Sequence, residues 1–174
     1  MKWLRFTFLI IVVAVLQIST VMNLLELTDL HIRPNILLVL LVYFAIHCDS
    51  YDAVITSFAL GFAADITGAV IGPHFISYGI IGSALAHLRR AILLKNTRQQ
   101  ALTIFITGIL TEVVALMLTG LKASGLAKTG VFEIIAVAVY SAVMWFLIKW
   151  FVSTTGKWLG VGVHRFGVRT GGRQ

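Results

Sequence analysis

The chain consists of apolar segments separated by short polar loops, and this alternation limits the folds open to it. The apolar segments are long enough for helices and lie at about residues 4–25, 34–47, 51–70, 73–88, 100–121 and 131–152. Hydrophobic residues make up 59% of the 174 residues and charged residues 12%, whereas soluble domains average roughly 45–50% and about a quarter. A water-soluble fold of this size would be unable to bury so much apolar surface. The sequence therefore predicts an all-α fold, a polytopic transmembrane helical bundle of about six helices.

The first two segments depart from an ideal membrane span. Lys2 and Arg5 precede the first apolar run, as in a secretory signal, but no small-x-small cleavage site follows it, which favours a transmembrane helix. The second segment begins at Pro34, a residue suited to the first turn of a helix. This segment is shorter than the ~20 residues that a span needs, so we expect neighbouring helices to shield it in part.

The basic residues are unevenly distributed among the loops. An N-terminus in the cytoplasm and six alternating spans place 11 of the 14 Lys and Arg residues on the cytoplasmic side, as the positive-inside rule requires. A five-helix count would put the basic C-terminal tail outside and fits the rule less well. We therefore predict a multi-pass membrane protein with both termini in the cytoplasm.

The chain divides into a transmembrane domain, residues 1–152, and a tail, residues 153–174, which is basic, rich in glycine and free of acidic residues. We expect the tail to be loosely ordered or to lie on the membrane. Basic residues of the tail and of the loop after the fourth segment either contact anionic lipid or a cytoplasmic partner, or only fix the topology. These candidates are Arg89, Arg90, Lys95, Arg98, Arg165, Arg169 and Arg173. Because the basic residues lie in short blocks between apolar runs, we expect no nucleic-acid binding.

Two acidic residues, Asp65 and Glu112, lie deep within apolar segments. An ionisable residue inside a bilayer is costly to bury and suggests a function. Counted from the cytoplasmic side, both residues lie at or just beyond mid-depth, so we expect them to approach one another. They form either a proton or cation path or a polar clamp between packed helices, and we favour the clamp.

The sequence lacks the familiar motifs of enzymes and metal sites. Its histidines are scattered and do not show the i,i+3 or i,i+4 spacing of a local metal site. The single cysteine, Cys48, excludes an internal disulfide. Nucleotide-binding loops, nucleophile elbows and zinc-protease helices do not occur either. We therefore expect no metal, no cofactor and no enzymatic activity, and an intramembrane enzyme with an unfamiliar site stays a weak alternative.

Small residues recur at four-residue spacing in the third and fourth segments. In the third segment, Ala53, Ser57 and Gly61 share one helix face with Asp65. In the fourth segment the small residues are Gly79, Gly82, Ser83 and Ala86. Small side chains let helix backbones approach closely. We therefore expect these two faces to be helix-packing surfaces that receive the helices of a partner protein.

Three stretches resemble the rod shape-determining protein MreD family. They are Arg33–Ala45, with the sequence RPNILLVLLVYFA, Gly61–Gly68, with GFAADITG, and Gly72–Tyr78, with GPHFISY. The family typically shows an apolar helix that ends near Asp-x-x-[Ser/Gly]-Gly, followed by a Gly-x-His-x-x-Ser-Tyr element. Chain length, number of apolar segments and the basic loop after the fourth segment also fit this family.

The resemblance implies a non-enzymatic inner-membrane component of the bacterial cell-elongation machinery, which maintains rod shape and supports lateral peptidoglycan synthesis. It implies direct binding of the bitopic protein MreC, which the chain would hold as a scaffold. It also implies a complex with RodA, a class B penicillin-binding protein and the filament protein MreB. A homodimer is left open.

The family resemblance also suggests a fold similar to the substrate-binding subunits of vitamin transporters, which have an internal pocket. By this analogy, the pocket or polar clamp would be formed by Asp65, His74, Ser77, Tyr78 and Glu112. The alternative function is therefore that of a substrate-binding subunit of a small-molecule or vitamin transporter.

Overall fold

A computed structural model describes residues 3–19, 34–68, 72–88, 96–122 and 131–159 of the chain. Within these ranges the regular structure is helical, and strands do not occur. The helices are α1 (Trp3–Ile18), α3 (Ile36–His47), α4 (Ser50–Thr67), α5 (Pro73–Leu88), α6 (Thr97–Lys122) and α7 (Val131–Trp158). The prediction of an all-α bundle of about six helices is confirmed for the described part of the chain.

Helix α3 is the centre of the bundle. Every residue from Leu37 to Ala45 is buried, so all faces of this helix are covered. A helix that is apolar on all sides belongs in an interior, and α3 contacts α1, α4, α5, α6 and α7. Its 12 residues extend about 18 Å, which is short for a bilayer. The expectation that neighbouring helices shield this segment is therefore met, since the surrounding helices take the place of lipid.

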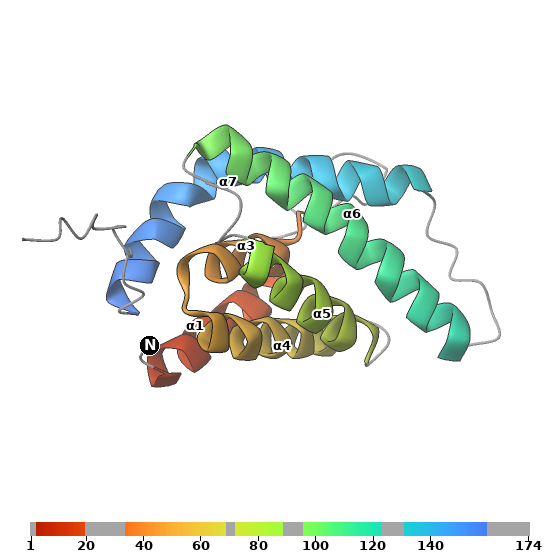
Figure 1. Cartoon of the computed structure of the whole chain (residues 1–174), viewed down its shortest axis with the longest axis horizontal. Coiled ribbons are helices and arrows are strands. Elements are labelled where there is room, and N and C mark those ends of the chain that lie inside the picture. Colours follow the sequence, from red (N-terminus) through yellow and green to blue (C-terminus); the bar gives the residue numbers. More distant parts are fainter. Residues whose placement is uncertain (1–2, 20–33, 69–71, 89–95, 123–130, 160–174) are drawn as a thin grey trace, which may run out of the picture.

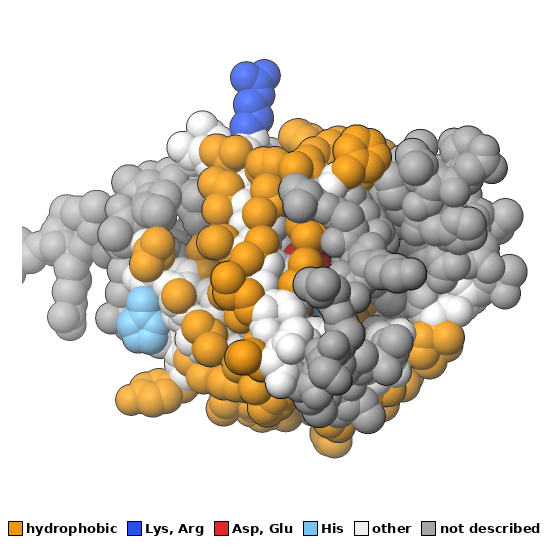
Figure 2. Space-filling model, turned by 90° about the vertical axis from the view of Figure 1, so that its right-hand side faces the viewer, with side chains coloured by type: hydrophobic (Ala, Val, Ile, Leu, Met, Phe, Trp, Pro, Cys, Tyr) orange, Lys and Arg blue, Asp and Glu red, His pale blue; other side chains and the backbone are white. Residues whose placement is uncertain are grey.

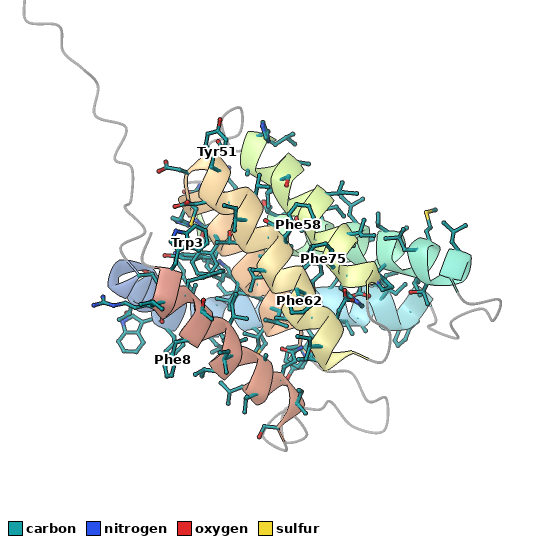
Figure 3. The ribbon with its side chains drawn as sticks, turned by 90° about the horizontal axis from the view of Figure 1, so that it is seen from below. Trp3, Phe8, Tyr51, Phe58, Phe62 and Phe75 are labelled. Carbon is teal, nitrogen blue, oxygen red and sulfur yellow. The ribbon has the colours of Figure 1, made fainter. Side chains whose placement is uncertain are left out.

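The other helices cover α3 in two groups (Figure 1). Helices α1, α4 and α5 lie on one side of it, and α6 and α7 cross over the opposite side. Seen from the side of α1, α4 and α5, aromatic side chains line the outer surface of the first group, among them Phe8, Phe62 and Phe75 (Figure 3). Phe62 and Phe75 pack edge to face with ring centroids 6.5 Å apart, and they link α4 to α5 on the outside of the bundle.

Among the described residues, two helices are long and apolar enough to cross a membrane, over Thr97–Leu121 in α6 and Ile134–Gly156 in α7. Only 28% and 22% of their most apolar windows are buried, so these helices are unlike the core helices of a soluble protein. Their exposed side chains are large and hydrophobic, as Met117 and Leu147 illustrate, with 68% and 73% exposure. Such surfaces suit a lipid environment.

Several helix ends differ from the sequence-based boundaries. Helix α1 ends at Ile18 rather than near residue 25, and residues 20–33 lie outside the described ranges. Helix α7 continues to Trp158, past the expected end at residue 152. The first residues of the expected tail are therefore helical. The helix runs without a break through Phe151 to Thr155, and Val152, at the expected boundary, is buried against the core. The expectations about the rest of the tail, residues 160–174, lie outside the described residues.

Candidate functional site

Asp65 closes the turn between α4 and α5. Its side chain is fully buried and accepts three backbone N–H groups, one just before the next helix and two in its first turn. Oδ2 accepts from Gly72 at 2.8 Å and from Phe75 at 2.9 Å, and Oδ1 accepts from His74 at 2.9 Å. The first turn of a helix has unpaired N–H groups and the positive end of the helix dipole, which a carboxylate satisfies well. The backbone of α5 thus compensates a buried acid that has no Lys or Arg beside it among the described residues.

His74 lies between the two deep acids that the sequence singled out. Its Nδ1 is 3.2 Å from Asp65 Oδ1, and its Nε2 is 3.9 Å from Glu112 Oε2. The His74 and Glu112 side chains are 27% and 24% exposed, whereas Asp65 is 0% exposed. The structure therefore brings Asp65, His74 and Glu112 together, with the imidazole between the α4–α5 turn and the middle of α6.

Asn35, which the sequence analysis overlooked, joins three helices at the start of α3. Its side chain accepts the N–H of Leu38 at 3.0 Å, so Asn35 is the N-cap of α3. Its Nδ2 donates to the Tyr78 hydroxyl at 2.7 Å, and its backbone N–H donates to Ser141 Oγ in α7 at 3.0 Å. An Asn directly before an apolar run is a helix-start signal. This signal was available in the sequence but was hidden by placing the helix start at Pro34.

Ser77 and Tyr78 point from α5 toward different neighbours. The Ser77 hydroxyl donates to the backbone carbonyl of Thr111 in α6 at 2.6 Å, and Tyr78 meets Asn35 of α3. Both side chains are fully buried. The predicted residues Asp65, His74, Ser77, Tyr78 and Glu112 thus lie in one polar network. Its buried members hydrogen-bond to other parts of the chain, Asp65 to the start of α5, Ser77 to α6 and Tyr78 to Asn35, and their role as a clamp or a ligand pocket stays a prediction.

The small-residue faces of α4 and α5 pack against each other. An added Cβ at Gly61 would lie 2.6 Å from the His74 carbonyl oxygen, and one at Gly82 would lie 2.2 Å from Ser57 Oγ. One at Gly79 would lie 2.2 Å from the Phe58 ring.

The remaining members of these faces are also enclosed within the chain. Ala53, Ser57 and Ala86 are buried, and the partly buried Ser83 donates its hydroxyl to the Gly79 carbonyl at 2.6 Å. The two faces thus pack on each other within the chain, and the expectation that they receive the helices of a partner protein stays a prediction.

The candidate lipid-contact residues fall mostly outside the described ranges. Arg98 is exposed in the first turn of α6. The remaining candidates, Arg89, Arg90, Lys95, Arg165, Arg169 and Arg173, lie outside the described residues. Contact of these residues with lipid or a cytoplasmic protein stays a prediction.

A family model described as rod shape-determining protein MreD matches residues 1–155 of the chain. The chain belongs to the MreD family. The match begins before α1 and ends within α7, so the polar network around Asp65 lies inside it. Comparison with curated proteins and with solved structures found no match.

Membership of the MreD family supports a role in rod-shape determination. The family is known as a shape-determining structural component rather than as an enzyme family, and its assignment agrees with the apolar surfaces of α6 and α7. The family match thus supports a role in cell shape, and the family match and the two apolar helices together indicate a membrane protein. The likeness to vitamin-transporter subunits stays a prediction.

Proposed function

We propose that this MreD-family chain is a non-enzymatic component of the bacterial cell-elongation machinery, which binds MreC and scaffolds the complex for lateral peptidoglycan synthesis. The observation that carries the proposal is the family match over residues 1–155, which covers nearly the whole bundle and not a single motif. RodA, a class B penicillin-binding protein and MreB are proposed as further members of the complex.

The internal bonding of the polar network supports a scaffold. Asp65, Ser77 and Tyr78 are fully buried and each is hydrogen-bonded to another helix or turn of the chain. Satisfied buried networks make a fold rigid and specific. These three groups hold helices together, and a rigid bundle is what a protein needs in order to position a partner in the membrane.

Depletion of the protein in its rod-shaped host tests the proposal. We expect depleted cells to become round, and the wild-type chain expressed from a plasmid to restore rods and to co-purify with MreC. Cell outline by phase-contrast microscopy and MreC recovery by immunoblot are the two measurements. Rods of normal shape after depletion would contradict the proposal.

A substrate-binding subunit of a vitamin or small-molecule transporter is the second candidate function. It is favoured by one observation, the partial exposure of His74 and Glu112, 27% and 24%, beside an otherwise satisfied network. Loss of vitamin uptake in depleted cells that keep their rod shape would support this function and not the scaffold.

We also propose that the chain crosses the inner membrane with both termini in the cytoplasm. The proposal rests on the excess of basic residues in the predicted cytoplasmic segments. In a Cys48→Ser background, an impermeant thiol reagent added to intact spheroplasts should label Ala127→Cys, in the loop predicted outside. It should label Gln174→Cys only after the membrane is permeabilised. Labelling of Gln174→Cys in intact spheroplasts would contradict this topology.

A further inference from the structure

The Glu112 carboxylate occupies an unusual position for a charged group. Glu112 lies within the membrane-spanning stretch Thr97–Leu121 of α6, about 14 Å along the helix from Leu121 at 1.5 Å per residue. Its side chain is 24% exposed. A carboxylate that is open to hydrocarbon at this depth is costly, so a polar group is expected to cover it in the membrane.

The described residues of the chain contact this carboxylate only loosely. In the described part of the structure, the closest basic side chain is the His74 imidazole, at 3.9 Å, which is beyond hydrogen-bonding distance. The other ring nitrogen of His74 faces Asp65 at 3.2 Å. Two acceptor oxygens on Glu112 thus share one distant contact, whereas Asp65 receives three short hydrogen bonds. The arrangement is complementary to an external hydrogen-bond donor.

The surface around Glu112 is apolar. Leu116, one turn further along the same face, is partly exposed, and Leu110, Val113 and Met117 on the adjoining faces of α6 are 50%, 38% and 68% exposed. Figure 2, which faces the end of the molecule toward which α6 extends, shows that the described part of this face is mostly hydrophobic. A single acid in an apolar surface is complementary to a partner helix that is apolar and carries one hydrogen-bond donor.

The face of α6 that carries Glu112 becomes more exposed toward the C-terminal end of the helix. Glu112, Leu116 and Gly120 follow at four-residue spacing and share one face. The first two are partly exposed and Gly120 is exposed. An added Cβ at Gly120 would meet nothing within 4 Å, whereas one at Gly61 or Gly108 would meet another helix within 3 Å. Figure 1 shows this C-terminal half of α6 running beyond the end of α3.

We propose that the Glu112–Leu116–Gly120 face of α6 is the docking surface for one membrane-spanning helix of a partner protein, which places a Lys, Arg or other hydrogen-bond donor against the Glu112 carboxylate. This inference rests on the proposed function, because it places the MreC helix on α6. Gly120 has no side chain and lets the two backbones approach closely there. Leu116 supplies an apolar contact with the partner helix, and Glu112 fixes the depth in the membrane at which the two helices meet.

A second copy of this chain fits the surface less well than such a partner. Two copies with the same orientation in the membrane would be related by a two-fold axis, which brings the same residues of both copies together. The two Glu112 carboxylates would then face one another, and like charges in a medium of low dielectric repel strongly. Lipid tails fit poorly as well, since they have no donor.

Cysteine cross-linking to full-length MreC tests the docking surface. In the Cys48→Ser background, Leu116→Cys and Gly120→Cys are each paired with a series of single cysteines along the MreC membrane helix, and disulfides are formed by mild oxidation in membranes. Val139→Cys on α7, whose native side chain is 46% exposed, is the matched control. We expect disulfides from positions 116 and 120 at every third or fourth MreC position and none from position 139. Disulfides formed only from position 139, or equally from all three positions, would overturn the proposal.

Replacement of the acid provides a second measurement that does not depend on cross-linking. Glu112→Gln should lower the recovery of MreC about three- to tenfold, which corresponds to one interhelical hydrogen bond in a membrane, and Glu112→Asp should restore part of it. The thermal unfolding midpoint of both variants in detergent shows whether they are folded. Recovery equal to wild type in folded Glu112→Gln would overturn the docking surface and leave the proposed function standing. If the wild-type chain itself recovers no MreC, the proposed function fails as well.

Discussion

Replacement of Asp65 by alanine is expected to lower the free energy of unfolding by roughly 3 kcal/mol or more, because it leaves three backbone N–H groups at the start of α5 without their acceptor. A buried donor that loses its partner costs about 1–3 kcal/mol, and bonds to a charged acceptor are the stronger ones. Asp65→Asn keeps one acceptor oxygen and should cost about half as much. The measurement is unfolding of the purified chain in mixed micelles with increasing dodecyl sulfate.

The acidic residue at the other end of α4 serves as the control for this prediction. Asp49 is exposed, whereas Asp65 is fully buried. Interactions of an exposed side chain contribute little to stability, so Asp49→Ala should change the free energy of unfolding by less than about 1 kcal/mol. Equal losses for Asp65→Ala and Asp49→Ala would show that the three N–H bonds contribute little to stability. The loss would then come from removal of a negative charge.

The second apolar segment shows which features of the fold the sequence predicts and which it does not. The segment was expected at 34–47 and is helical over Ile36–His47, because an uncharged run that begins with Pro and Asn contains its own start signal. Its central place in the bundle was not predictable. In a membrane protein both the lipid-facing and the protein-facing sides of a helix are apolar, so the pattern of side chains does not distinguish a central helix from a peripheral one.

The polar network was predicted only in part for a similar reason. The positions of Asp65 and Glu112 along their helices predicted similar depths in the membrane and hence proximity. Position along a helix does not predict which groups a side chain bonds to. The bonds from Asp65 to α5 depend on the turn between the helices, where Gly72 has a φ of 118° that other residues rarely adopt. Spacing of small residues likewise predicts a close approach but not the helix that is approached, and within the chain the small-residue face of α4 packs on α5.

Gly61 is the position where an added side chain should do most damage to the packing of α4 on α5. A Cβ there would lie 2.6 Å from the His74 carbonyl oxygen and 2.8 Å from the Phe75 Cα, both of which belong to the backbone. Backbone atoms have no rotamer that would relieve the contact, so α5 must shift as a whole. We expect Gly61→Ala to lower the free energy of unfolding by about 3 kcal/mol, at the upper end of overpacking effects.

Substitutions at two other glycines serve as comparisons for Gly61→Ala. At Gly79 the added Cβ would meet the Phe58 ring, the end of a side chain that is able to rotate, so Gly79→Ala should cost less than Gly61→Ala. At Gly120 nothing lies within 4 Å, and alanine there should leave the isolated chain unchanged or up to about 1 kcal/mol more stable. The same unfolding titration ranks all three variants, and a cost at Gly120 as large as that at Gly61 would contradict the packing argument.

The shift forced by Gly61→Ala would also act on the Asp65 cap. His74 and Phe75, whose backbone atoms an alanine at position 61 would displace, are two of the three residues that donate to the Asp65 carboxylate. The double variant Gly61→Ala, Asp65→Ala should therefore lose less stability than the sum of the single losses, since the first change already weakens what the second removes. Full additivity would mean that α5 moves without disturbing the cap. A fall in MreC recovery with either single variant would then follow from a distorted α4–α5 pair, and a direct contact of Gly61 with MreC would not be needed to explain it.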